Sequence, residues 1–185
     1  ERACKEWNDL PPEPEPPSDT TGYTWTLIKQ YQEGSVESFR KYQCMHCLHP
    51  GCVSVCLVGA LVKLENGPVV YDSYKCIGCR YCMMACPYKA RSFIHEELTK
   101  QAEVAPRGKG TVESCTLCVH RIDEDTANKR DPACAEACNA EGHMAMIFGD
   151  LKDSNSNVSK ALKQYASKAI REDLGLNPGI RYRGI

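Results

Sequence analysis

The apolar residues of this chain are grouped in short stretches, and their spacing predicts small strands. Residues 23–31 are rich in β-branched and aromatic side chains, which is typical of a strand. Residues 60–65 and 68–72 flank Asn66-Gly67, a dipeptide that favours a two-residue hairpin turn. We therefore expect short antiparallel hairpins in place of one large sheet.

Two more elements are predicted near the end of the chain. Residues 144–148 predict a further short strand. A helical spacing of i, i+3, i+4 and i+7 follows in Val158, Ala161, Leu162, Tyr165, Ala166, Ala169 and Ile170. Ser156 or Asn157 suits the helix N-cap, and Gly175 suits its end. The stripe consists mostly of small residues, so we expect it to pack on this chain or on a partner rather than in a membrane.

Three polar stretches separate these elements. Residues 10–22 are acidic and rich in proline, which predicts an extended surface connector without a binding role. Residues 95–114 and 119–133 contain glycine, proline and charges, and fit docking loops and ordinary surface loops equally well.

Composition limits the classes of function. The 185 residues carry a formal charge of −1, so no net basic surface indicates nucleic acid as a partner. No stretch approaches the roughly 20 apolar residues that span a bilayer, so we expect any membrane attachment to come through another subunit. Only 3 Phe and 2 Trp are present, and bound metal is expected to supply part of the folding free energy.

The 13 cysteines are the most specific feature of the sequence, and nearly all of them lie in three runs. The runs are Cys44-x2-Cys47-x4-Cys52-x3-Cys56, Cys76-x2-Cys79-x2-Cys82-x3-Cys86-Pro87, and Cys115-x2-Cys118 followed by Cys134-x3-Cys138. In the bacterial ferredoxin signature, which the middle run matches, three close thiolates bind one [4Fe-4S] cluster and the fourth reaches a neighbouring cluster. The sequence therefore predicts several [4Fe-4S] clusters and a role in electron transfer.

Two other uses of cysteine compete with clusters. A structural zinc site needs four ligands in two separated pairs and has no use for Cys82, two residues beyond a pair. A disulfide framework suits a small secreted chain, but 13 is an odd number and the spacings are those of cluster loops.

Nothing in the sequence indicates a catalytic centre. The two complete central runs supply full cysteine sets, so no iron is left open for substrate, and no nucleophile elbow, phosphate loop or zinc-protease motif is present. His46, His49 and His120 lie beside cysteines, where a structural role or hydrogen bonding to sulfur is favoured over direct ligation because cysteine fills each ligand position. Five cations flank the runs and are expected to be solvated or to dock a partner, although positive charge near a cluster also raises its potential: Lys41, Lys75, Arg80, Lys89 and Arg91.

The chain resembles a known family over nearly its whole length. The motifs that carry the resemblance are Cys44-Met-His-Cys47, Cys76 to Tyr88, Cys115-Thr-Leu-Cys-Val-His-Arg121 and Pro132 to Cys138. They are similar to the four-cluster subunits of bacterial and archaeal membrane oxidoreductases, such as the β subunits of formate dehydrogenase and dimethyl sulfoxide reductase. The segment around Cys4 looks like the tail of that family's first cysteine run.

The resemblance implies a crossed pairing of ligands. It assigns one cluster to Cys44, Cys47, Cys52 and Cys86, a second to Cys56, Cys76, Cys79 and Cys82, and a third to Cys4, Cys115, Cys118 and Cys134. Cys138 would belong to a fourth cluster whose other ligands precede Glu1. Three clusters would therefore be complete from this chain.

The same resemblance implies an α+β fold of two pseudo-symmetric ferredoxin-like modules with short hairpins and long loops. Residues 44–93 would form a two-cluster module, residues 1–43 with 94–150 a second, split module, and residues 151–185 a helix and tail.

Within the family, residues 87–93, 108–118 and 174–185 look most like the ferredoxin-like subunit of the membrane complex associated with dissimilatory sulfite reductase. That likeness implies a noncatalytic relay at the outer, periplasmic face of the cytoplasmic membrane, working with an integral quinone-reacting subunit and a multihaem cytochrome. The alternatives are the electron-transfer subunit of a molybdopterin enzyme such as formate dehydrogenase and, more distantly, a zinc or redox-sensing regulatory module.

Overall fold

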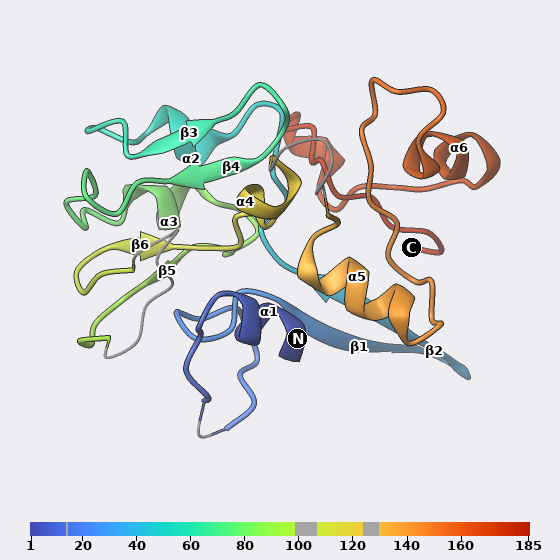
Figure 1. Ribbon diagram of the computed structural model, residues 1–185, viewed down its shortest axis with the longest axis horizontal. Coiled ribbons are helices and arrows are strands. Elements are labelled where there is room, and N and C mark those ends of the chain that lie inside the picture. Colours follow the sequence, from blue (N-terminus) through green and yellow to red (C-terminus); the bar gives the residue numbers. More distant parts are fainter. Residues whose placement is uncertain (14, 99–106, 124–129) are drawn as a thin grey trace.

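Short helices and two-stranded sheets connected by long loops make up the chain. A computed structural model describes residues 1–13, 15–98, 107–123 and 130–185 (Figure 1). The sheets are antiparallel hairpins or pairs, as expected for an α+β chain with short hairpins. No helix within the described ranges is long and apolar enough to cross a membrane.

The first hairpin pairs strand β1 (Leu27–Glu33) with strand β2 (Val36–Tyr42). Its register runs from Leu27 opposite Tyr42 to Glu33 opposite Val36, with a turn at Gly34 that has a φ of 63°. The strand predicted over residues 23–31 is therefore partly correct, since it begins only at Leu27. Its partner strand was not predicted from the sequence.

The second hairpin lies at the Asn-Gly dipeptide, as predicted, but its turn is longer than the two residues expected, because the N–H of Leu64 already bonds the carbonyl of Pro68. Strand β3 (Leu61–Lys63) pairs with strand β4 (Val69–Tyr71), and the turn between them includes Gly67 at a φ of 116°. Leu61 and Val69 are buried, so one face of this hairpin lies against the core.

The third pair joins segments far apart in the sequence. Strand β5 (Ser92–Phe93) pairs with strand β6 (Val112–Glu113). The prediction of a polar surface loop over residues 95–114 is wrong for its last part, because residues from Arg107 to Glu113 include several of the most buried in the chain. Residues 99–106 of that predicted loop lie outside the described residues.

Arg107 and Glu113 explain that burial. The Arg107 Nε donates to Glu113 Oε2 at 2.7 Å, with both side chains almost fully buried. Arg107 also donates to the carbonyl of Gly22, at the end of the proline-rich connector. The Glu13 carboxylate accepts hydrogen bonds from the hydroxyls of Thr21 and Thr24. The connector is thus held by specific contacts to the rest of the chain, apart from residue 14, which lies outside the described residues.

Short helices carry or flank the cysteine loops. They are α1 (Arg2–Trp7), α2 (Gly51–Ser54), α3 (Tyr81–Ala85), α4 (Val119–Ile122) and α5 (Ala133–Ala140). Helix α1 lies against α5, which brings the beginning of the chain to its last cysteine run (Figure 1). Helix α4 falls within the predicted polar loop 119–133, of which residues 124–129 lie outside the described residues.

The C-terminal region differs from its prediction. Helix α6 (Asn157–Gln164) starts at the predicted cap, where the Ser156 hydroxyl accepts a hydrogen bond from the Ser159 N–H. It ends five residues before Ala169, because Tyr165 adopts extended backbone angles. A 3-10 turn, η1 (Glu172–Leu174), follows, and Gly175 caps that turn instead of α6. Residues 144–148 form no strand, so that prediction is wrong.

The tail after α6 returns to the first cysteine loop. The N–H of Gly179 donates to the carbonyl of Met45 at 2.8 Å, and the N–H of Leu48 donates to the carbonyl of Asn177 at 2.8 Å. The Tyr88 hydroxyl donates to the carbonyl of Ile170 at 3.1 Å. These contacts cover one side of the cysteine loop with residues that are distant in the sequence.

Candidate metal centres

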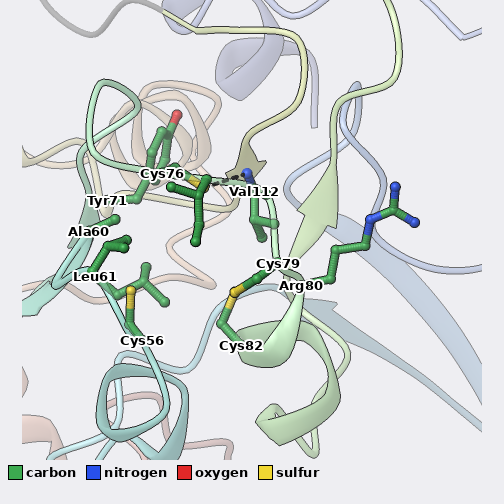
Figure 2. A pocket seen from close by; sticks show the side chains of 12 residues that line it. Cys56, Ala60, Leu61, Tyr71, Cys76, Cys79, Arg80, Cys82 and Val112 are labelled. Carbon is green, nitrogen blue, oxygen red and sulfur yellow. Dashed lines mark hydrogen bonds between the residues drawn. The ribbon is translucent and has the colours of Figure 1, made fainter.

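Cys56, Cys76, Cys79 and Cys82, here called the hairpin group, line one pocket. Figure 2 shows these four side chains around a common space that is walled by Ala60, Leu61, Tyr71 and Val112. Cys82 is on α3 and Cys56 follows α2, while the other two lie in the loop between β4 and α3. Cys79 is exposed, so this group has one edge open to solvent.

Gly78 is required for the tight loop between Cys76 and Cys79. Its φ is 68°, a conformation that L side chains rarely adopt. A Cβ at this position would lie 2.3 Å from the carbonyl oxygen of Gly110 and 3.0 Å from the ring of Phe93. The two-residue spacing therefore works here only because the second of the intervening residues is glycine.

Cys44, Cys47, Cys52 and Cys86 form the central group. The first three are buried, and Cys86 is half-buried at the end of α3. Cys47 lies close enough to the other three for their charges to act on it. The backbone N–H groups of Ala90 and Tyr88 hydrogen-bond the Cys86 sulfur.

Cys4, Cys115, Cys118 and Cys134 form the crossed group, which lines a second pocket together with Asn8, Trp25 and Gln43. Cys4 comes from α1, Cys115 follows β6, Cys118 caps α4, and Cys134 is on α5. The structure thus brings together the four cysteines that the crossed pairing requires, although 111 positions separate Cys4 from Cys115 in the numbering.

Cys138 stands apart from these groups. It is half-buried on α5, one turn after Cys134, and it lines neither pocket. The assignment of Cys138 to a cluster other than that of Cys115 stays a prediction.

The sulfur atoms are suited to metal ligation. All 13 cysteines are free thiols. Burial is the largest cause that raises the pKa of Cys47, Cys82 and Cys118 to about 11. Such thiols stay protonated at neutral pH, so a bound metal has to displace their protons. Within the described residues, no group of three His, Cys, Asp or Glu side chains is arranged to hold a single metal ion. A [4Fe-4S] cluster does not need such an arrangement, because each of its thiolates binds a different iron.

Hydrogen-bond donors point at several of these sulfurs, which favours their thiolate form. The donor and sulfur pairs are Val112 N to Cys76 at 3.4 Å, Leu117 N to Cys115 at 3.4 Å, Lys41 Nζ to Cys134 at 3.2 Å, Asn8 Nδ2 to Cys4 at 3.6 Å and an Arg91 NH2 to Cys52 at 3.6 Å. The sulfur atoms are soft donors that are mostly buried, lie in groups of four and in several cases accept hydrogen bonds. These properties fit [4Fe-4S] clusters.

The central group connects the other two. Cys52 packs with Cys82 of the hairpin group in one hydrophobic cluster. Cys44 and Cys47 pack with Cys4 and Cys115 of the crossed group in another. The spatial order is therefore hairpin group, central group, crossed group.

The three histidines have different surroundings. His46 is buried, and its Nδ1 accepts a hydrogen bond from the Val69 N–H at 3.0 Å. Burial is the main cause that lowers the pKa of His46 to about 3, so this imidazole is neutral. His49 and His120 are exposed. His46 thus links the first cysteine loop to β4, which is a structural role, as expected for a histidine at this position.

Two groups that position the sites were not predicted from the sequence. Asn8, which hydrogen-bonds both the carbonyl and the sulfur of Cys4, had no motif to identify it. Tyr182 donates a hydrogen bond to the carbonyl of Lys41, which fixes the backbone of the residue that contacts Cys134. The Tyr182 contact becomes visible only when distant segments are brought together, whereas Asn8 is only four residues from Cys4.

Comparison with known proteins agrees with these sites. Residues 36–151 match the 4Fe-4S dicluster domain family. The Hdr-like menaquinol oxidoreductase iron-sulfur subunit 1 of Archaeoglobus fulgidus is 47% identical over 75% of this chain and 54% of its own length. The iron-sulfur cluster-binding subunit of the menaquinone reductase of Nitratidesulfovibrio vulgaris is 33% identical over 97% of this chain and 80% of its own length. One subunit of the sulfite dehydrogenase of Allochromatium vinosum is 34% identical over 97% of this chain and 74% of its own length.

The chain spans about half the length of the Archaeoglobus relative. The match to the family covers well over half of this chain, and the relatives named above are subunits of oxidoreductases, two of them iron-sulfur subunits. The expected ferredoxin-type identity and the expected [4Fe-4S] cofactors are thereby confirmed. This chain belongs to the 4Fe-4S dicluster domain family and carries multiple [4Fe-4S] clusters.

Proposed function

We propose that the chain is a noncatalytic relay that passes single electrons along its row of clusters. The hairpin, central and crossed groups each hold one [4Fe-4S] cluster, and Cys138 belongs to a fourth site that needs further ligands. Bound clusters supply one-electron redox chemistry over a wide range of potentials. The packing of the central group against both other groups is the observation that carries this proposal.

The residues of the chain hold and insulate the clusters in this scheme. Buried apolar walls at the central and crossed groups exclude water, and N–H groups directed at sulfur stabilise the thiolates. The exposed Cys79 leaves the hairpin group open at one edge, where a redox partner can approach. Electrons would enter or leave at this edge and pass through the central group.

We also propose two modules. Residues 44–93 form one ferredoxin-like module, and residues 1–43 with 94–150 form the second, while residues 151–185 cover the first cysteine loop. The contact of α1 with α5 supports the split second module, since it places Cys4 beside the last cysteine run.

The partners in this proposal are an integral-membrane quinone-reacting subunit and a multihaem cytochrome, with the chain held peripherally on the outer face of the cytoplasmic membrane. The similarity to menaquinol and menaquinone oxidoreductase subunits supports the quinone partner. The similarity to a sulfite dehydrogenase subunit supports a place in sulfur or sulfite respiration.

A second candidate is the electron-transfer subunit of a molybdopterin enzyme. The resemblance of the cysteine motifs to the β subunits of formate dehydrogenase and dimethyl sulfoxide reductase favours it, and the similarity to a sulfite dehydrogenase subunit fits either candidate. Affinity purification of the complete protein from its membranes separates the candidates. Co-purified haem supports the first, and co-purified pterin supports the second.

A direct test of the relay uses the complete protein purified without oxygen. Iron and sulfide analysis should give multiple [4Fe-4S] clusters, and the protein should exchange electrons with redox dyes while converting no sulfur compound or formate on its own. Zinc in place of iron would support a regulatory module, and substrate conversion by the isolated protein would contradict a noncatalytic role.

A further inference from the structure

One cation beside the candidate cluster sites differs from the others in its burial. The side chain of Arg91 is 3% exposed, whereas Lys75, Arg80 and Lys89 are exposed and Lys41 is half-buried. Arg91 precedes β5 and lies only five residues after Cys86. One NH2 group of Arg91 donates to the Cys52 sulfur at 3.6 Å.

The charge of Arg91 has no carboxylate partner among the described residues. Its Nε and its other terminal nitrogen are buried without a hydrogen-bond acceptor. Glu113 is buried too, but its carboxylate binds Arg107 at 2.7 Å. A buried guanidinium without compensation is strongly unfavourable, so the fold must offer it negative charge from another source.

Sulfur is that source. The Cys52 sulfur accepts a hydrogen bond from Arg91, and the charges of Cys44 and Cys86 also act on the guanidinium once these cysteines are thiolates. The charge of Arg91 also acts on Cys82 of the hairpin group. Arg91 therefore lies where the central and hairpin groups meet, with its two unpartnered nitrogens in the interior.

We propose that Arg91 is the shared counter-cation of the central and hairpin clusters and sets their potentials above those the thiolates alone would give. This inference rests on the ligand groups proposed above. A thiolate-bound [4Fe-4S] cluster carries net negative charge, and reduction adds one more electron to it. A buried positive charge stabilises the reduced form more than the oxidised form, because little water is present to screen it. Arg91 thus favours the reduced form of the central cluster, which lies in the middle of the row.

The experiment is a redox titration of the complete protein, purified without oxygen and followed by electron paramagnetic resonance. The signal of the central cluster is the one that Cys47→Ala removes. Arg91→Met keeps the length of the side chain but removes its charge, and Arg91→Lys keeps the charge. Arg80→Met is the matched control, because Arg80 is also an arginine beside ligands but points away from the pocket and is exposed (Figure 2).

Arg91→Met should retain its iron and shift the reduction equilibrium of the central cluster at least tenfold toward the oxidised form, about 59 mV for a one-electron couple. The hairpin cluster should shift in the same direction, while Arg91→Lys and Arg80→Met stay near the wild type. Unchanged potentials in an iron-loaded Arg91→Met protein would overturn the inference.

Loss of iron from Arg91→Met is also informative when Arg91→Lys is measured beside it. Iron retained in Arg91→Lys supports a requirement for charge, and iron lost in both variants shows a requirement for the shape of arginine and overturns the charge role. Wild-type protein without [4Fe-4S] signals would contradict the proposed function itself, which distinguishes that failure from the failure of this inference.

Discussion

Replacing Gly78 by alanine should destabilise the protein and release the cluster of the hairpin group. The added Cβ would lie 2.3 Å from the carbonyl oxygen of Gly110, and backbone at that position cannot rotate away as a side chain would. The φ of 68° adds strain of its own. Relief of the clash moves the loop that carries Cys76 and Cys79.

The structure allows the two costs to be separated. A left-handed conformation costs a non-glycine residue about 1–2 kcal/mol. Overpacking typically adds about 1–3 kcal/mol. Gly59 provides the matched control, because its φ is 63° but nothing lies within 4 Å of a Cβ there, and it is three residues from Cys56. Gly59→Ala should therefore show only the first cost, and Gly78→Ala both.

Thermal unfolding under anaerobic conditions measures the difference. For a protein of this size, 1 kcal/mol corresponds to about 2–4 °C, so Gly78→Ala should melt about 2–12 °C below Gly59→Ala. Iron analysis should show a loss confined to Gly78→Ala. Equal melting temperatures and equal iron contents in the two variants would refute the packing argument.

Two other substitutions test neighbouring parts of the structure. Lys41→Met removes the ammonium that lies 3.2 Å from the Cys134 sulfur, so the potential of the crossed cluster alone should fall in a redox titration. A fall in the potentials of all clusters would contradict the assignment of Lys41 to the crossed cluster. Arg107→Met leaves the buried Glu113 without its partner and should cost about 3–5 kcal/mol in denaturant unfolding, which Glu113→Gln in the same chain should partly restore. Burial already holds the pKa of Glu113 above its ordinary value, and loss of Arg107 raises it further. The folded state of Arg107→Met then binds the Glu113 proton more tightly than the unfolded state does. The loss of unfolding free energy in Arg107→Met should therefore grow as the pH rises above the ordinary range of a glutamate and shrink as the pH falls. A loss of unfolding free energy that is independent of pH would show that Glu113 does not titrate.

The cysteine spacing predicted much of the candidate site. Gaps of two residues identify loops that direct successive thiolates at one cluster, and the proline after Cys86 marks a ligand that crosses to a neighbour. The family resemblance added Cys4, which stands alone in the sequence but meets Cys115 in the structure. The Asn66-Gly67 dipeptide located the second hairpin correctly through its local backbone preference, although the turn is longer than the two residues expected.

Elements that depend on distant contacts were not predicted. The helical stripe continues in sequence to Ile170, but Lys168 pairs with Tyr182 and Tyr88 binds the Ile170 carbonyl, so packing replaces the last turns of the helix. The strand expected at residues 144–148 has no partner strand in the described chain.

Burial of single charges was equally hidden from the sequence. Five cations flank the cysteine runs, and nothing local distinguishes Arg91, which is buried, from Arg80, which is not. The distinction depends on β5 and the segment that begins at Arg107, which come together only in the fold.

The most direct test of the proposed cluster arrangement is whether Cys4 is a ligand of the crossed group. Electron paramagnetic resonance and iron analysis of the reduced complete protein should be compared for Cys4→Ala, Cys115→Ala and Cys138→Ala. The account predicts that the first two variants lose the same cluster signal, because both sulfurs line one pocket, and that Cys138→Ala retains it. Retention of that signal in Cys4→Ala, together with its loss in Cys138→Ala, would contradict the crossed arrangement.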